Sequence, residues 1–168
     1  MRRLAFAAVS LAFLANACQP AAMEPTEEQK AAIADTIRQL SAEMWATLDP
    51  VDFDDMMRYM HPDPESYFVG ESAQWVNMLT VYANPSQVRE VWEPIMARRR
   101  TQETVPSKEY VAVLSENLAL NVTEGTYTIT DTLGTTTEPN RFSATVVWVR
   151  RDAEWKMLHV HQSWRATN

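Results

Sequence analysis

The C-terminal region constrains the fold of this chain more than any other part. Two runs rich in β-branched and aromatic residues, 141–150 and 154–165, flank the polar tetrapeptide 151–154. This composition favours strands, and a short polar link between two such runs is typical of a β-hairpin. The sequence therefore predicts two long antiparallel strands, joined by a tight turn, at the end of the domain.

Helical patterns occupy the first half of the chain. Thr26 and Gln29 have the spacing of a capping box, which predicts a helix start, and Asp49-Pro50 ends this first helix. A second, shorter helix is expected from Asp52 to the proline-rich segment 61–64, because proline cannot continue a helix. The apolar residues that recur at helical spacing in these two segments are Ile33, Ile37, Leu40, Met44, Trp45, Leu48, Phe53, Met56, Met57 and Met60.

A third helix is expected from Asn84-Pro85, with asparagine as the cap and proline at the first helical position. Pro94 should kink it. The basic run Arg98–Arg100 is expected in its last turn, where cations interact favourably with the helix dipole. The apolar stripe of this helix is Val88, Val91, Trp92, Ile95 and Met96.

Strand patterns dominate from Glu103 onward, and two short strands are expected earlier, at 66–69 and 74–82. The later strands are predicted at 110–114 and 117–130, before the C-terminal hairpin, with turns at Ser115-Glu116 and Leu133-Gly134. Gly125 inside the longest strand indicates a bulge or a sharp bend. Helices followed by strands predict an α+β fold, with three helices covering one face of a curved antiparallel sheet.

The composition fits one domain. The chain has 168 residues, 46% of them hydrophobic, and a formal net charge of −7. A core of this size is sufficient for a single domain with a tail, and the acidic balance argues against nucleic acid or an anionic membrane surface as the partner. The sequence contains no glycine-rich phosphate loop, no nucleophile elbow and no catalytic Cys/His pair, so we expect no cofactor and no metal.

The N-terminus has the pattern of an export signal. Two arginines precede an apolar run over 4–15, and a cleavage site of small residues follows it. The apolar run is too short to span a membrane as a helix. Cys18, the single cysteine, resembles the lipidated cysteine of bacterial lipoproteins, and plain secretion is the alternative. We therefore expect a signal peptide at 1–17, a tether at 18–25 and a domain at 26–168. The protein is then periplasmic and lipid-anchored at Cys18, or secreted.

The order of elements resembles the nuclear transport factor two-like superfamily, including SnoaL-like proteins. The sharpest match is the segment 147–155 followed by 159–163, which is similar to the last two strands of the association domain of calcium/calmodulin-dependent kinases. The resemblance implies a cone-like sheet wrapped around the N-terminal helix, with a pocket at its wide end. Members of this superfamily isomerise, cyclise, dehydrate, bind ligands or only oligomerise, so the fold does not choose a function.

The resemblance also places possible site residues. The kinase association domain lines its pocket with three arginines, whose positions fall on Thr126, Val146 and Gln162 here, so an anion pocket of that kind is not expected. The carboxylate base and Tyr/Asp pair of ketosteroid isomerase relatives are not placed by any motif in this sequence.

The last strand offers two histidines. His159 and His161 lie two residues apart and therefore share one face of a strand. The resemblance directs the other face of this strand toward the pocket. Its residues are Leu158, Val160, Gln162 and Trp164. We therefore expect the histidines, together with Trp155, in packing or in a homodimer interface, and a metal or acid/base role is the alternative. A metal site that includes His61 is a weaker alternative still.

Glu124 is the candidate catalytic residue. It alternates with four other residues onto a face that should point inward, and a buried carboxylate with a raised pKa suits a general acid or base. Alternatively, Gly125 marks a bulge that turns Glu124 to solvent. The residues that share its face are Leu118, Leu120, Val122 and Thr126.

Three functions remain open. The first is binding of a small, largely apolar ligand without defined chemistry. The second is an enzyme of isomerase, cyclase or dehydratase type that uses Glu124. The third is a dimerisation or assembly module. The expected ligand-binding residues are Tyr67, Trp92, Thr126, Trp148, Val160, Gln162 and Trp164.

Overall fold

A computed structural model describes residues 24–62, 67–72, 80–82 and 85–165. The predicted signal peptide, Cys18 and most of the tether lie outside this range, as does the predicted helix cap Asn84. Helices and strands follow one another as the α+β prediction requires. The elements are α2 (Glu27–Ala46), α3 (Phe53–Met57), β1 (Tyr67–Ser72), β2 (Thr80–Tyr82), α4 (Pro85–Met96), β3 (Arg99–Ser115), β4 (Leu118–Asp131), β5 (Asn140–Arg151) and β6 (Glu154–Arg165).

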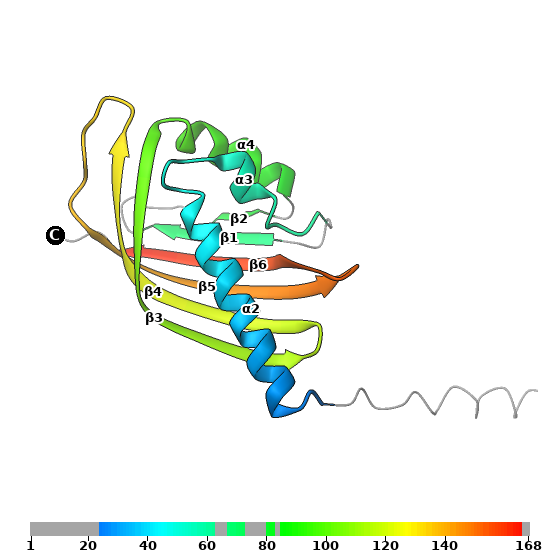
Figure 1. Cartoon of the computed structure of the whole chain (residues 1–168). Coiled ribbons are helices and arrows are strands. Elements are labelled where there is room, and N and C mark those ends of the chain that lie inside the picture. Colours follow the sequence, from blue (N-terminus) through cyan, green and yellow to red (C-terminus); the bar gives the residue numbers. More distant parts are fainter. Residues whose placement is uncertain (1–23, 63–66, 73–79, 83–84, 166–168) are drawn as a thin grey trace, which may run out of the picture.

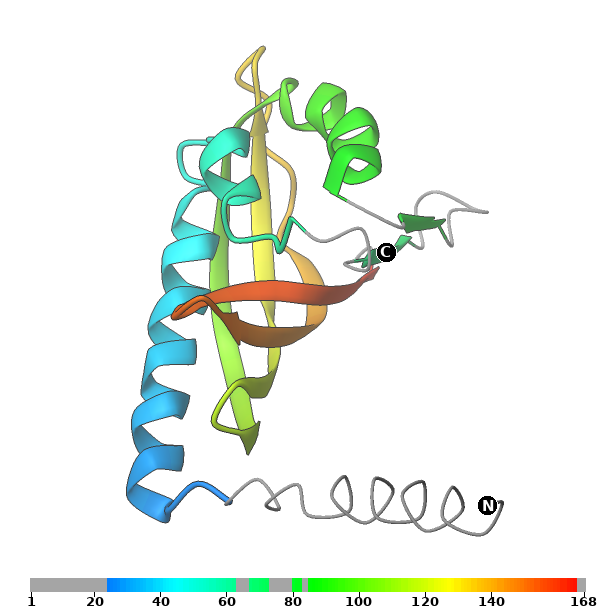
Figure 2. The same cartoon turned by 90° about the vertical axis from the view of Figure 1, so that its right-hand side faces the viewer.

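The strands form one curved sheet in the order β2-β1-β6-β5-β4-β3. Neighbouring strands are antiparallel except for β1, which pairs with β6 in parallel. Helix α2 crosses the concave side of this sheet, and α3 and α4 lie together near one end (Figures 1 and 2). The concave side is called the inner face below, and the opposite side the outer face.

The predicted C-terminal hairpin is confirmed. Strands β5 and β6 pair along almost their whole length, and Arg151 lies opposite Glu154. The two residues between them, Asp152 and Ala153, have positive φ angles of 51° and 67°. Two consecutive positive φ angles match the right-handed twist of the flanking strands, which explains the tight connection.

The start of α2 is also as predicted. The Thr26 side chain accepts a hydrogen bond from the backbone N–H of Gln29, and the Gln29 side chain accepts one from the Thr26 N–H. One face of the helix is buried against the sheet, and the buried residues recur at the helical spacing seen in the sequence. Its buried residues are Ala34, Ile37, Ser41, Met44 and Trp45.

Strands β3 and β4 both turn sharply partway along their length (Figure 1), and their pairing has an irregularity opposite Gly125, where the sequence predicted a bulge or a sharp bend. A Cβ atom on Gly125 would lie 2.3 Å from the Val105 carbonyl oxygen and 2.9 Å from the Phe142 ring. The register of β3 shifts at the same place, because Pro106 pairs with Gly125 and Lys108 with Glu124. Glycine is therefore required here by the close approach of β3 and β5.

The basic run was placed wrongly by the sequence pattern. Helix α4 ends at Met96, and Arg99 and Arg100 begin β3. Backbone pairing explains the difference: the Val51 N–H donates to the Arg100 carbonyl at 3.1 Å. The Gln102 N–H donates to the Leu48 carbonyl at 2.7 Å. These partners come from the segment after α2, so β3 starts well before the predicted residue 110.

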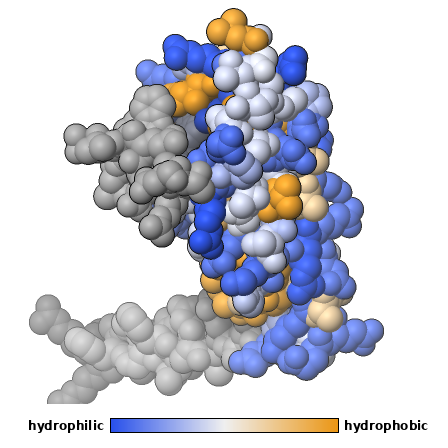
Figure 3. Space-filling model, turned by 90° about the vertical axis from the view of Figure 1, so that its left-hand side faces the viewer, coloured by the Kyte–Doolittle hydropathy of each residue, from blue (hydrophilic) through white to orange (hydrophobic). Residues whose placement is uncertain are grey.

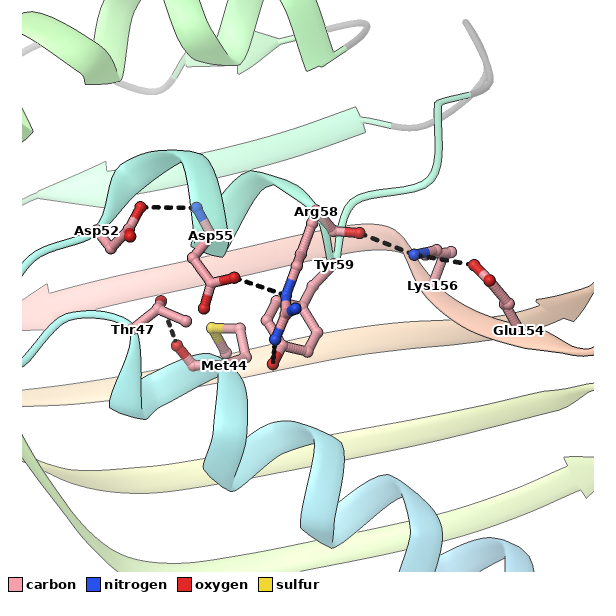
Figure 4. A network of polar contacts seen from close by, with 8 residues as sticks. All are labelled: Met44, Thr47, Asp52, Asp55, Arg58, Tyr59, Glu154 and Lys156. Carbon is pink, nitrogen blue, oxygen red and sulfur yellow. Dashed lines mark hydrogen bonds and ion pairs between the residues drawn. The ribbon is translucent and has the colours of Figure 1, made fainter.

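A polar network fixes α3 between α2 and β6 (Figure 4). Asp52 caps α3 by accepting from the Asp55 N–H, which agrees with the predicted start of this helix. The Arg58 guanidinium pairs with Asp55 at 2.8 Å and donates to the Tyr59 hydroxyl. Lys156 of β6 donates to the Arg58 carbonyl at 3.0 Å. The network anchors the α3 region to β6, which lies between β1 and β5 in the sheet.

Candidate functional site

The inner face of β4 is the opposite of the predicted one. Ala119, Asn121 and Thr123 are almost completely buried, with at most 1% of their surfaces exposed. Asn121 donates to Glu109 at 2.8 Å and accepts from the Thr123 hydroxyl at 3.0 Å. Small and hydrogen-bonded polar residues therefore line the interior of β4.

Glu124 consequently points outward, and its predicted inward orientation is wrong. Its side chain is 43% exposed and lies 3.5 Å from the Lys108 ammonium group. It pairs with Ser143, whereas Gln162 pairs with the adjacent Ala144, so the two side chains lie on opposite faces of the sheet. The alternative reading, in which Glu124 faces solvent, is the one that the structure shows.

Thr126 follows Glu124 on the outer face. It pairs with Val105, which is 52% exposed. Its predicted place among the ligand-binding residues is therefore wrong, because alternation along β4 directs Gly125 and Tyr127 inward instead.

The end of β6 has the predicted orientation. Val160, Gln162 and Trp164 pair with the inner-face residues of β5, Val146, Ala144 and Phe142. His159 and His161 pair with Val147 and Thr145 and thus lie on the outer face. Trp148 is also on the inner face, but it is fully buried in the core.

Trp155 is separated from the histidines by a bulge. Val147 pairs with His159 and Trp148 with Met157, so Leu158 is an additional residue in β6. Trp155 accordingly lies on the same face of β6 as Met157 and packs against the core. Its predicted place on the outer face beside the histidines is wrong, since the bulge changes the face that alternate residues occupy.

Two other predicted residues are only partly placed. The backbone of Tyr67 pairs with His159 of β6, and its side chain lies outside the described part of the structure. His61 is buried, at 8% exposure, and its backbone N–H donates to the Met157 carbonyl.

Five aromatic side chains from five elements meet on the inner face. The Trp45 and Phe142 rings have centroids 5.2 Å apart, and Tyr127 and Phe142 lie 6.3 Å apart. Trp92 and Trp164 lie 5.4 Å apart, and Trp164 pairs directly with Phe142 across the sheet. We call Trp45, Trp92, Tyr127, Phe142 and Trp164 the aromatic cluster. Trp92, Tyr127 and Trp164 keep part of their surface exposed.

A polar group borders the aromatic cluster at Tyr127. Arg99 is partly buried, and its guanidinium donates to the side-chain carbonyl of Gln102. Burial lowers the pKa of Arg99, and the nearby Tyr127 opposes that change. Burial likewise raises the pKa of Tyr127, with Arg99 opposing. Sequence reasoning missed Arg99, because it is one of three consecutive arginines and was assigned to a helix end.

A separate open groove, of about 430 Å³, lies between α3 and the start of α4. Within it, Arg89 pairs with Asp54 at 2.7 Å and covers the Phe53 ring. Both charges are thus compensated. The lining residues are Asp54, Met57, Arg58, Met60, Pro62, Pro85, Ser86 and Arg89.

Among the described residues, no three His, Cys, Asp or Glu side chains are grouped so that they could hold a metal ion. Likewise, no helix in the described ranges has the length and apolar character needed to cross a membrane.

Comparison with solved structures identifies the fold. An NTF2-like superfamily protein from Salmonella enterica superposes with a TM-score of 0.67 at 17% identity, covering 82% of this chain and 94% of the other. The dehydrochlorinase LinA-type3 from Novosphingobium barchaimii gives 0.66 at 11% identity, covering 85% and 93%. The association domain of CaMKII from C. elegans gives 0.62 at 15% identity, covering 82% and 99%.

Identities this low show the fold alone. Among curated proteins, a comparison of sequences finds no match to this chain. A family model described as the SnoaL-like domain matches residues 37–167, which include the second half of α2, all later elements and the whole aromatic cluster. The chain therefore belongs to the SnoaL-like family, with the NTF2-like fold that its sequence predicted.

Proposed function

We propose that this domain binds a small, largely apolar molecule against the aromatic cluster on the inner face. The supporting observation is the convergence of rings from α2, α4, β4, β5 and β6, three of which stay partly exposed. Partly exposed tryptophan and tyrosine side chains offer a large apolar area to a ligand, with a polar edge to orient it. Gln162 lies two residues before Trp164 on the same face of β6. Its side-chain amide can orient a polar substituent of the ligand.

The proposal includes no defined chemistry. Glu124, the predicted acid/base, is on the outer face, so the enzyme alternative loses the residue on which it depended. Glu109, a carboxylate directed inward by β3, accepts a hydrogen bond from Asn121. The similar folds include a dehydrochlorinase and an association domain, and this variety shows that the fold itself does not decide between catalysis and binding.

Native mass spectrometry of the protein purified from its own host tests the binding function. We expect a small molecule that remains bound in gentle spraying and leaves on denaturation. Trp164→Ala should lose this molecule, because it removes a partly exposed ring of the cluster. Trp155→Ala is the matched control, since Trp155 packs on the core elsewhere. Equal retention of the ligand by both variants would refute the proposed position.

We also propose that the outer face joins two copies of this chain. Tyr110 and Leu114 on β3 are 64% and 59% exposed. Tyr110 pairs with Val122, and the neighbouring Leu120 pairs with Val147, so apolar side chains continue across three strands. On the side of the molecule seen in Figure 3, residues of hydrophilic or intermediate hydropathy predominate and hydrophobic residues form separate spots. The outer face is therefore a candidate for a buried interface.

Light scattering of purified variants tests the dimer. Val147→Asp should halve the mass in solution, because it places a charge within the outer face. Leu133→Asp is the control, since Leu133 is 90% exposed in the turn after β4. A monomeric wild-type protein at high concentration would contradict the proposal.

Export is a further part of the proposed function. We infer that residues 1–17 direct the chain out of the cytoplasm and that Cys18 carries acyl chains, with the tether connecting the anchor to α2. Intact mass measurement of the mature protein should show a chain that begins at Cys18 with an added lipid mass. Cys18→Ser should release the domain from membranes, and an unmodified Cys18 in the mature wild type would contradict the anchor.

A further inference from the structure

We propose that Arg99, Thr104 and Tyr127 form a subsite for a carboxylate or a similar anion at the border of the aromatic cluster, so that the ligand is an apolar acid. This inference rests on the proposed binding function and names the chemical class of its ligand. It does not use the three arginine positions of the kinase association domain, which are occupied here by Thr126, Val146 and Gln162.

Arg99 differs from three other arginines of the described residues in the partner of its guanidinium group. Arg38, Arg58 and Arg89 each have an aspartate oxygen within 2.8 Å. Arg99 has no carboxylate within ion-pair distance among the described residues, and its hydrogen bond goes to the neutral amide of Gln102. Arginine stays charged in proteins, and burial of a charge without a counter-ion is costly. An anionic ligand would compensate that charge.

Thr104 supplies a second, independent observation. Its hydroxyl is buried and has no hydrogen-bond partner in the part of the chain that the structure describes. Thr104 lies directly opposite Tyr127 in the pairing of β3 with β4, and Gln102 is two residues away on the same face. Buried hydroxyl groups are normally hydrogen-bonded, so an unpaired one on the face that also carries Gln102, the partner of Arg99, indicates a place for an acceptor.

Tyr127 connects this polar group with the aromatic cluster. Its ring lies 6.3 Å from Phe142, and its hydroxyl interacts electrostatically with Arg99. The Tyr127 hydroxyl can donate a hydrogen bond to an anion, and burial raises its pKa further above neutrality. A ligand that places its apolar body on the rings and its acid group at Arg99 would contact both sets of residues at once.

The bulge at the start of β3 makes this arrangement possible. Arg99 pairs with Asp131 and Thr101 with Thr130, so Arg100 is an additional residue. The bulge lets the Arg99 side chain reach Gln102 on the inner face, while Arg100 is exposed. The backbone of Arg100 is held by Val51, which fixes the bulge to the segment after α2.

The test compares two probes of nearly equal shape, naphthalene-1-acetate and naphthalene-1-acetamide, which differ in charge at one end. Binding is measured from the tryptophan fluorescence of the full-length protein and confirmed by calorimetry. We expect the wild type to bind the acetate about tenfold or more tightly than the amide, because hydrogen bonds from a charged donor to a carboxylate are the stronger kind. Arg99→Gln should abolish this preference by weakening acetate binding about tenfold.

Arg141→Gln is the matched control, because Arg141 is exposed on β5, and it should keep the preference. Thermal unfolding of Arg99→Gln without ligand distinguishes a structural role, since removal of an uncompensated charge should leave the melting temperature unchanged or higher. A lower melting temperature, together with equal loss of both probes, would overturn the subsite. Equal binding of acetate and amide by the wild type would overturn it and leave the proposed function standing. Failure of both probes to bind would count against both proposals.

Discussion

The two faces of strand β4 are chemically the reverse of what burial would suggest. The buried inner face carries Ala119, Asn121 and Thr123, and the partly exposed outer face carries Leu120 and Val122. The inner residues are small because large side chains from α2 and β5, such as Ile37 and Phe142, fill the space in front of them. The difference teaches that the more apolar face of a strand is not always the one that the domain buries within itself.

Substitution of Phe142 should give the largest effect on stability, because Phe142 is a large buried side chain of the inner face. It is 6% exposed and contacts both Trp45 and Tyr127. Phe142→Ala should lower the free energy of unfolding by about 3–5 kcal/mol, since it leaves a cavity among rings. Ser143→Ala, on the outer face, should change it by less than about 0.5 kcal/mol. Urea unfolding of both variants measures the difference, and similar effects would contradict the assignment of the two faces.

A substitution at Gly125 tests the bend by which the sheet curves around α2. Gly125→Ala should destabilise the fold by about 3 kcal/mol, because the new Cβ atom overlaps the backbone of β3. Gly134→Ala is the control: it has open space around it but a φ of +89°, so the loss should be about 1–2 kcal/mol. Thermal unfolding compares them. A tolerated Gly125→Ala would mean that the strands can separate without cost.

Thr123 tests the polar part of the inner face. Thr123→Val keeps the shape but leaves the Asn121 side-chain oxygen without its donor, so the expected loss is about 1–2 kcal/mol. Thr145→Val, on the outer face of β5, should be neutral or slightly stabilising. Chemical denaturation measures both variants. Neutral behaviour of Thr123→Val would show that a water molecule replaces the hydroxyl.

Tyr127 gives the smallest expected effect, which appears only at high pH. Burial raises its pKa in the folded state, so the folded protein holds this proton more tightly than the unfolded chain. Its contribution is complete below about pH 10, the usual tyrosine value, and is lost as the pH rises toward the folded-state pKa. Wild type should therefore lose more stability than Tyr127→Phe between about pH 9 and 11. Parallel melting curves for the two proteins would contradict a buried Tyr127 hydroxyl.

Local signals in the sequence predicted most of the fold. The capping box at Thr26 and the turn between β5 and β6 depend on neighbours in sequence, the irregularity at Gly125 depends on a residue without a side chain, and all three are confirmed. The family resemblance, carried by the last two strands, agrees with the family model and with the solved structures. For the site, the sequence predicted the inner position of Val160, Gln162 and Trp164.

The sequence alone therefore determined the α+β class, the order of elements and the aromatic composition of the interior. Tertiary structure decided which side chains face the ring cluster. Bulges at Arg100, Ser107 and Leu158 arise from pairing between strands, and each one changes the face that the following residues occupy. The predicted positions of Glu124, Thr126 and Trp155 were wrong, and Arg99 was missed. The face that a strand residue occupies depends on how its strand pairs with its neighbours, and the local sequence of one strand does not specify that pairing.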